Sequence, residues 1–116
     1  MNDYYNASYD SMQASLEVLG NIQSTRKIAI LGDMLELGEY SEKLHSMVGA
    51  EVAKNKIDIL CTIGNLSKNI AETAKKLGIK DVYEFNTNEE CITKLIDIVR
   101  KDDAILIKAS NAMHFG

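Results

Sequence analysis

The residues best suited to chemistry lie in the stretch GDMLELGE (residues 32–39), directly after a short apolar run. Two glycines and a helix-like segment behind them give this stretch the layout of a phosphate-binding loop. A dinucleotide fingerprint requires G-x-G-x-x-G, however, and a Walker loop requires a lysine where Glu39 stands. The carboxylates of Asp33, Glu36 and Glu39 would repel a phosphate. The loop therefore suits a cation, an ammonium group or a neighbouring domain, unless Asp33 and Glu39 only cap and solvate a helix start.

A second group of polar residues precedes the first helical segment, in DYYNAS (residues 3–8). An aspartate such as Asp3 can accept hydrogen bonds from ribose hydroxyls, and an asparagine such as Asn6 can donate one to a phosphate oxygen. The start of a helix also favours anions. The alternative is that Ser8 caps the helix and the residues before it have no binding role.

A third group follows the last apolar run, in IKASNA (residues 107–112). The ammonium group of Lys108 can pair with a carboxylate, and Ser110 and Asn111 can bind the same group through hydrogen bonds. The alternative is a lysine at a strand end that reaches solvent. His45 is expected to be partly buried, neutral and hydrogen-bonded, because it adjoins a residue of an apolar stripe. No Ser-His-Asp set, metal motif or nucleophilic cysteine stands out, so no catalytic or metal-binding residue is predicted.

The composition is that of a globular domain. The 116 residues are 46% hydrophobic and 26% charged, and the net charge of −4 argues against nucleic acid or an anionic membrane as the main partner. No apolar run approaches the roughly 20 residues that span a bilayer, and no basic start with an apolar core marks a signal peptide. Cys61 and Cys91 are expected to be buried thiols in a reducing cytosol.

Hydrophobic periodicity predicts one helix, then three strand–helix pairs, then a final strand. Strands separated by helices run parallel with right-handed crossovers. The expected fold is therefore α/β: one three-layer α/β/α Rossmann-like domain with a mainly parallel sheet. The expected strands are residues 27–31, 58–63, 82–85 and 104–107, and the expected helical stripes are Met12, Leu16 and Leu19; Leu44, Met47, Val48 and Val52; Leu66, Ile70, Ala74 and Leu77; and Ile92, Leu95, Ile96 and Val99.

In such folds ligands gather at the carboxyl ends of the strands, where the helices begin. The loops at that edge are residues 32–39, 64–65, 86–87 and 108–111. Only the first and last of these are rich in polar side chains, and the segment before the first helix can join them. The sequence therefore predicts a site between these three segments.

Three segments together resemble the C-terminal domain of the Mur ligases of the MurF type. DYYNASYDSM (residues 3–12) is similar to the signature D-x-Y-N-A-N-P-D-S-M that opens that domain. KIAILGDMLELGEYSEKLH (residues 27–45) is similar to R-x-A-V-L-G-D-M-x-E-L-G followed by a histidine, which is highly specific. DDAILIKASNAM (residues 102–113) is similar to G-D-x-V-L-V-K-G-S-R-x-M near the end. The resemblance covers the whole chain, in the expected order.

The resemblance implies a cytoplasmic ligase of peptidoglycan synthesis that adds D-alanyl-D-alanine to the UDP-muramoyl tripeptide. It implies ATP and Mg²⁺ as cofactors, bound mainly by a central ATPase domain that carries the Walker loop. The ends of residues 1–116 are abrupt, so we expect this chain to be the C-terminal domain of a longer three-domain enzyme. Such a domain closes over the central one, completes the site and excludes water, and it is expected to be inactive alone.

The resemblance also assigns roles to residues of this sequence. Asp3 and Asn6 match the segment that reaches ATP, with Asp3 on the ribose side and Asn6 on the phosphate side. Lys108 and Ser110, with Asn111, match the segment that faces the D-alanyl-D-alanine carboxylate. Asp33 and Glu36 are expected to line the same crevice towards its ammonium end. Among the departures of this sequence from the family, Tyr9 stands for a proline, Ala109 for a glycine and Asn111 for an arginine.

Two other readings remain open. One is a free-standing flavodoxin-like or receiver-like binding or signalling domain, for which Asp33 and Lys108 give a loose match. A receiver would also need a second acid beside Asp33 and a serine or threonine after a middle strand, and both are missing. The other is a Mur-type ligase that adds a single amino acid, which the GDMLELGE segment disfavours by resemblance alone.

Overall fold

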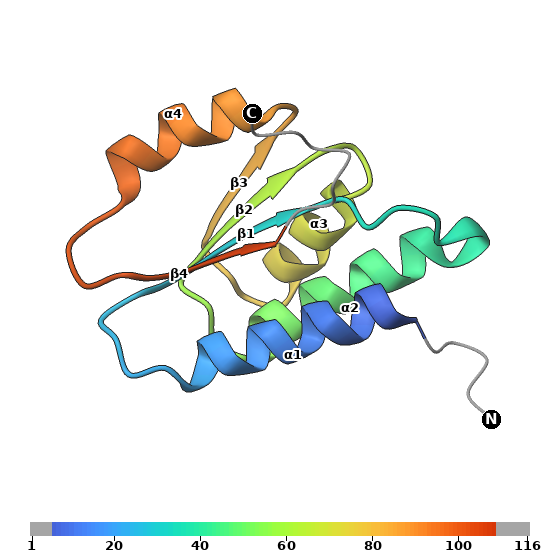
Figure 1. Cartoon of the computed structure of the whole chain (residues 1–116), viewed down its shortest axis with the longest axis horizontal. Coiled ribbons are helices and arrows are strands. Elements are labelled where there is room, and N and C mark those ends of the chain that lie inside the picture. The colour runs from blue at the N-terminus through green and yellow to red at the C-terminus, as the bar shows by residue number, and fades with distance from the viewer. Residues whose placement is uncertain (1–5, 109–116) are drawn as a thin grey trace.

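The sheet consists of four short strands that pair in parallel in the computed structural model, which describes residues 6–108 (Figure 1). The strands are β1 (Lys27–Gly32), β2 (Ile59–Ile63), β3 (Asp81–Phe85) and β4 (Ala104–Lys108), in the spatial order β3-β2-β1-β4. The central strands β1 and β2 are buried along nearly their whole length. Their continuous aliphatic runs fit this position, because helices cover both faces of the sheet.

The helices divide unequally between the two faces of the sheet (Figure 1). One face packs against α1 (Ala7–Asn21), α2 (Ser41–Lys54) and α3 (Lys68–Lys76), and the other against α4 (Asn88–Ile98). This division follows from right-handed crossovers, because the chain moves outward from β1 through β2 to β3 and then returns to β4. The predicted three-layer α/β/α architecture and parallel sheet are confirmed. No helix in the described part of the chain is long and apolar enough to cross a membrane.

The larger apolar cluster lies between the sheet and helices α1 to α3. It joins Leu31 and Leu60 of the central strands to Leu16 and Val48 of the helices. Helices α2 and α3 pack tightly at Gly49, where an added Cβ would lie 2.5 Å from the backbone oxygen of Ile70 on α3. Only glycine allows this separation of the two helices, so the sequence of α2 fixes how closely α3 packs.

The smaller apolar cluster lies under α4 and contains both cysteines. Cys61 on β2 and Cys91 on α4 are buried free thiols, as predicted. The hydrogen bond that the Cys61 thiol donates to Cys91, together with burial, raises the pKa of Cys61. Cys61 therefore stays protonated at neutral pH and acts as a packing residue.

The predicted apolar stripe of α4 is wrong for three of its four residues. Ile92, Ile96 and Val99 are 49%, 77% and 40% exposed. The helix instead turns the face one residue earlier towards the sheet, formed by Cys91, Leu95 and Ile98. Both faces have helical spacing, so periodicity alone could not choose between them.

The predicted stripe of α3 is correct in its middle and wrong at its end. Ile70 and Ala74 are fully buried, but Leu77 is 57% exposed. The helix ends at Lys76, and Gly78 then turns the chain with a φ of +109°. Leu77 therefore no longer lies on the buried helical face.

An ion pair closes the amino-terminal edge of the sheet. Arg26 precedes β1 and holds Asp103, which precedes β4, through Nε–Oδ1 and Nη2–Oδ2 contacts of 3.0 and 2.8 Å. Arg26 also donates to the carbonyl oxygen of Ile98 at 2.8 Å. The paired guanidinium lowers the pKa of Asp103 to about 2. The contact fixes β4 beside β1 although the two residues are far apart in sequence.

The strand order decides where the sheet reverses direction. The order β3-β2-β1-β4 matches one half of a Rossmann fold and differs from flavodoxin-like sheets, in which the first and third strands are neighbours. The flavodoxin-like or receiver-like alternative therefore fails on topology. From β1 the chain continues to β2 on one side, and the connection that ends in β4 lies on the other side. The β1–β4 junction is therefore the switch point of the sheet, and ligands bind at such points in open α/β sheets.

Candidate functional site

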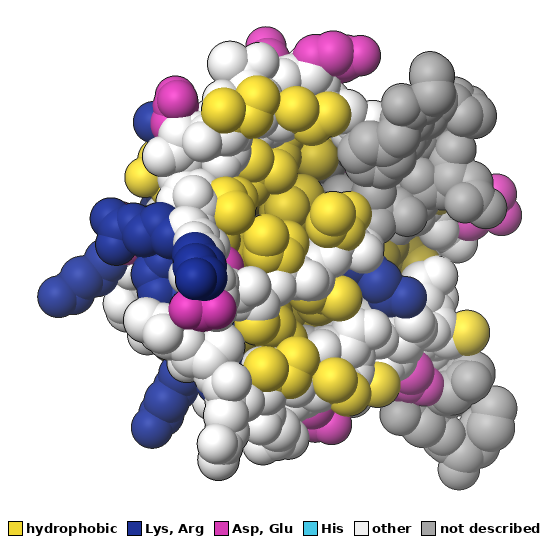
Figure 2. All heavy atoms as spheres, turned by 60° about the vertical axis from the view of Figure 1, so that its left-hand side comes forward, with side chains coloured by type: hydrophobic (Ala, Val, Ile, Leu, Met, Phe, Trp, Pro, Cys, Tyr) yellow, Lys and Arg dark blue, Asp and Glu magenta, His cyan; other side chains and the backbone are white. Residues whose placement is uncertain are grey.

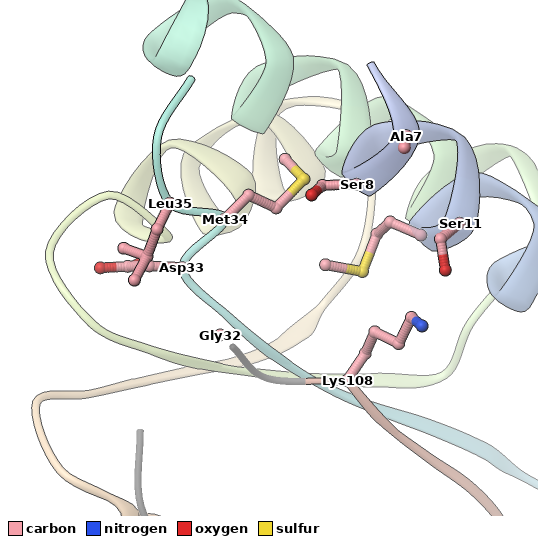
Figure 3. A pocket seen from close by; sticks show the side chains of 9 residues that line it. Ala7, Ser8, Ser11, Gly32, Asp33, Met34, Leu35 and Lys108 are labelled. Atoms are coloured by element: carbon pink, nitrogen blue, oxygen red, sulfur yellow. The ribbon is translucent and has the colours of Figure 1, made fainter. Parts of the chain in front are cut away.

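A cavity of about 320 Å³ opens at this switch point, beside the carboxyl ends of β1 and β4 (Figure 3). Three segments form its walls, as the sequence predicted: the first turns of α1, the loop after β1, and the end of β4. The lining residues are Ala7, Ser8, Ser11 and Met12; Gly32, Asp33, Met34 and Leu35; and Lys108. The volume lies at the lower end of the range typical of small-molecule sites.

Lys108 provides the positive charge of the cavity. It pairs with Leu31 across the β1–β4 ladder, on the face of the sheet that carries α1. The neighbouring Ile107 is 60% exposed on the opposite face, as alternation along a strand requires. The ammonium end of Lys108 points towards Ser11 (Figure 3), and within residues 6–108 no carboxylate forms an ion pair with it. The lysine therefore lines the cavity with its charge unneutralised by a described side chain.

Two hydroxyls on α1 complete this wall and were not among the predicted site residues. Ser8 and Ser11 are exposed, one turn apart on the side of α1 that faces the cavity. Figure 3 shows the Ser8 hydroxyl beside the side chain of Met34 and the Ser11 hydroxyl above Lys108. The i, i+3 spacing after the helix start was the available signal, because residues so spaced share a helical face.

Asn6, rather than Ser8, caps α1. Its Oδ1 accepts hydrogen bonds from the backbone N–H groups of Ser8 and Tyr9, at 2.9 and 3.1 Å. The extended backbone of Asn6 is the usual conformation of a helix cap. The cap uses the carboxamide oxygen, whereas binding of a phosphate oxygen requires the amide N–H₂ group. The ATP-binding role of Asn6 stays a prediction, and its predicted companion Asp3 lies outside the described residues.

Asp33 holds the residue that precedes α3, and not the helix that follows its own loop. Its Oδ1 accepts from the backbone N–H of Ser67 at 2.7 Å and from the Ser67 hydroxyl at 2.6 Å, at the start of α3. Figure 3 shows the carboxylate directed away from Lys108. An added Cβ on Gly64 would lie 2.6 Å from its carboxyl carbon. These contacts tie the loop after β1 to the start of α3, while a role of Asp33 at the ammonium end of a ligand stays a prediction.

The other acids of the loop do not line the cavity. Glu36 is exposed and has a φ of +61°, a left-handed conformation that is unusual for a residue other than glycine. Glu39 is exposed in a short 3₁₀ helix, Gly38–Tyr40. The structure therefore does not bring Glu36 together with Lys108. The remaining predicted residues of this side, Ser110 and Asn111, lie outside the described part of the chain.

The loop after β1 is also held from helix α2. The His45 side chain is fully buried, and its Nε2 accepts the backbone N–H of Met34 at 2.9 Å. Its Nδ1 lies 2.7 Å from the carbonyl oxygen of Ser41. The expected hydrogen bonding of His45 is confirmed, and its burial is more complete than predicted. Consecutive loop residues, Asp33 and Met34, are thus fixed by contacts with two different helices.

The described residues do not form a nucleotide cradle or a magnesium site of their own. No three His, Cys, Asp or Glu side chains among residues 6–108 come together in a way that could hold a metal ion. The carboxylate nearest the cavity, that of Asp33, is already bonded to Ser67. The N–H₂ group of Asn6 is the one predicted phosphate contact that the described residues include. These residues fit an anion at the Lys108 wall better than a complete ATP–Mg²⁺ complex.

Comparison with known proteins gives a consistent result. The model of the family "Mur ligase, glutamate ligase domain" matches residues 1–111. A UDP-N-acetylmuramoyl-tripeptide–D-alanyl-D-alanine ligase from Bacillus subtilis is 38% identical over 115 residues, which cover 97% of this chain and 25% of that protein. The chain therefore spans about a quarter of the length of this curated relative.

Solved structures agree in fold. MurF from Acinetobacter baumannii superposes with a TM-score of 0.79 at 28% identity, and the match covers 97% of this chain and 25% of that one. MurF from Thermotoga maritima in complex with ADP gives a TM-score of 0.75, also at 28% identity, over 98% of this chain and 25% of that one. In both cases the match covers nearly all of this chain but only about a quarter of the solved protein.

Proposed function

This chain belongs to the Mur ligase glutamate ligase domain family, and from that premise we propose that it is the C-terminal domain of an ATP-dependent ligase. The reaction proposed is the addition of D-alanyl-D-alanine to UDP-N-acetylmuramoyl-tripeptide in peptidoglycan synthesis, the activity for which its relative is named. The domain, residues 1–116, would act with a central ATPase domain of the same chain and would be inactive alone. The enzyme would work in the cytoplasm, where ATP is available.

One observation supports this proposal most directly: the cavity at the switch point has one cationic wall. Lys108 points into it next to the hydroxyl of Ser11 (Figure 3). A carboxylate bound there would gain a charge-assisted hydrogen bond from the lysine and a neutral one from a serine. D-Alanyl-D-alanine has one carboxylate, two methyl groups and one amine, and the apolar lining contributed by Met12, Met34 and Leu35 suits the methyl groups.

The chemistry proposed for the whole enzyme assigns this domain a positioning role. ATP and Mg²⁺, bound mainly by the central domain, would supply the activation of the tripeptide carboxylate as an acyl phosphate. The amine of the dipeptide would then attack that carbon, lose a proton and form the amide as the bond to the phosphate breaks and phosphate leaves. By holding the dipeptide carboxylate, the Lys108 wall would orient the amine towards the central domain, and closure would exclude water. Asn6 would meet the phosphate side of the nucleotide on closure.

The binding step can be tested on the 116-residue chain itself. We expect D-alanyl-D-alanine to shift backbone amide NMR signals of residues around the cavity, and D-alanyl-D-alanine amide, which lacks the carboxylate, to do so much more weakly. Lys108→Gln should weaken binding of the dipeptide about tenfold, because a hydrogen bond to a charged group contributes on the order of 1.5–3 kcal/mol.

A matched control separates the site from the general charge. Lys80 is exposed just before β3, at the opposite edge of the sheet, so Lys80→Gln changes the net charge equally. It should leave the dipeptide affinity unchanged. Equal binding of the dipeptide and its amide would contradict the carboxylate site. ATP-dependent ligation by residues 1–116 alone would contradict the dependence on a central domain.

A further inference from the structure

We infer that His45 is a positioning residue for the cavity, acting through Nε2 as a hydrogen-bond acceptor that fixes the loop at Met34. The inference rests on the proposed function in one respect, since it takes the occupant of the cavity to be D-alanyl-D-alanine. His45 does not line the cavity itself. Its effect on a ligand would pass through the backbone of Met34 and the two side chains, Met34 and Leu35, that do line it.

The contacts of His45 define which nitrogen carries the proton. The carbonyl oxygen of Ser41, 2.7 Å from Nδ1, can only accept a hydrogen bond, so Nδ1 must donate. The backbone N–H of Met34, 2.9 Å from Nε2, can only donate, so Nε2 must offer its lone pair. Both contacts are satisfied by the neutral Nδ1–H tautomer and by no other protonation state. The ring is therefore a fixed connector between the first turn of α2 and the loop.

The loop needs this connector because β1 ends just before it. The N–H of Met34 lies beyond the last residue of β1, Gly32, and Met34 is only 5% exposed. A buried backbone N–H without a partner is costly, so removal of Nε2 would force the loop to move until the N–H reached water. Asp33 is anchored separately on Ser67, so the displacement would fall on Met34 and Leu35. Those are the two apolar residues that the loop after β1 contributes to the cavity wall.

Two substitutions distinguish the acceptor from the bulk of the ring. His45→Gln can place its carboxamide oxygen near the position of Nε2 and keep the acceptor, whereas His45→Phe keeps the ring and removes it. Val52→Ala is the control for general destabilisation, because Val52 is also fully buried on α2 but lies two turns further from the loop. All three variants and the parent chain would be checked for cooperative unfolding before use.

Three measurements on the 116-residue chain test the inference. In the parent, ¹⁵N spectra of the imidazole should show a protonated Nδ1 and an unprotonated Nε2, and the Met34 amide should exchange slowly with solvent. In His45→Phe the Met34 amide should exchange fast, cross-cavity NOEs between Met34 and Ser8 should weaken, and D-alanyl-D-alanine affinity should drop about fivefold, as loss of one buried hydrogen bond implies. His45→Gln should restore most of both properties, and Val52→Ala should change neither.

The outcomes separate this inference from the proposed function. A proton on Nε2 in the parent, or slow Met34 exchange with intact NOEs in His45→Phe, would overturn the positioning role. Dipeptide affinity that stays at the parent value while the Met34 contacts are lost would overturn it as well. If the parent chain fails to bind D-alanyl-D-alanine at all, the proposed ligand is wrong, and the exchange and NOE data still decide whether His45 sets the cavity wall.

Discussion

Gly64→Ala is the substitution whose effect follows most directly from the geometry of the site. Gly64 directly follows β2 and has a φ of +112°, and an added Cβ would lie 2.6 Å from the carboxyl carbon and both carboxylate oxygens of Asp33. Real Cβ atoms do not approach so closely. The carboxylate of Asp33 must then leave its position, and its two hydrogen bonds to Ser67 are lost with it. The methyl group of an alanine at position 64 would thus release the loop after β1 from the start of α3.

The expected loss of stability has two parts. The left-handed backbone of Gly64 becomes strained in alanine, which costs on the order of 1–2 kcal/mol. Displacement of Asp33 removes charge-assisted hydrogen bonds to Ser67, which contribute about 1.5–3 kcal/mol. We therefore expect the free energy of unfolding to fall by about 3–5 kcal/mol. Since small domains have about 5–15 kcal/mol in total, the variant should fold but be marginally stable.

Urea denaturation of the 116-residue chain measures this change, with Gly78→Ala as the control. Gly78 has nearly the same φ, +109°, and an added Cβ would have no atom within 4 Å. Gly78→Ala should therefore show the strain alone, about 1–2 kcal/mol. In the double variant that combines Gly64→Ala with Asp33→Ala the clash is absent. Its loss of unfolding free energy should therefore be clearly smaller than the sum of the losses in the two single variants. Equal losses for Gly64→Ala and Gly78→Ala would refute the proposed coupling to Asp33.

Two further predictions concern the charged residues. The pKa of Asp103 is lowered from 3.8 to about 2 by Arg26, so its stabilising contribution is present above pH 4 and is lost as the pH falls towards 2. Acid unfolding of Asp103→Asn followed by circular dichroism should lack that part of the pH dependence, and an unchanged profile would contradict the ion pair. Glu36 has a φ of +61° in the exposed loop, so Glu36→Gly should raise the midpoint of urea unfolding by an amount equivalent to about 0.5 kcal/mol. A lowered midpoint would show that the Glu36 side chain stabilises the loop.

Local patterns in the sequence were sufficient for the elements and the layers. The runs at residues 27–31 and 58–63 are mostly apolar without alternation, which is typical of central strands, and a glycine directly follows each run. The position of the cavity also followed, because the carboxyl ends of parallel strands share one edge. The cap at Asn6 was not predicted and Ser8 was named in its place, since asparagine and serine cap helices about equally well and both occur within three residues.

The partners of the site residues depended on contacts distant in sequence. Asp33 and Ser67 are 34 positions apart, and no periodicity links them. They meet because β1 and β2 are adjacent in the sheet, which became known only with the strand order. The outward face of α4 was missed for a related reason. Ile92 and Ile96 have the same spacing as Cys91 and Leu95, and only the position of the helix over the sheet selects between them.

Because β4 lies at the edge of the sheet, the cavity can open and re-form while the rest of the domain stays folded. Within residues 6–108, β4 pairs only with β1. The ion pair that holds its start joins residues 77 positions apart, so a large chain closure must precede its docking. Edge strands of this kind are the units most prone to open by sub-global unfolding while the rest of a domain stays native. Each opening of β4 would remove Lys108 and with it the charged wall of the cavity. A ligand that binds Lys108 would therefore also stabilise the pairing of β4 with β1. It would slow hydrogen exchange along β4 in proportion to its affinity.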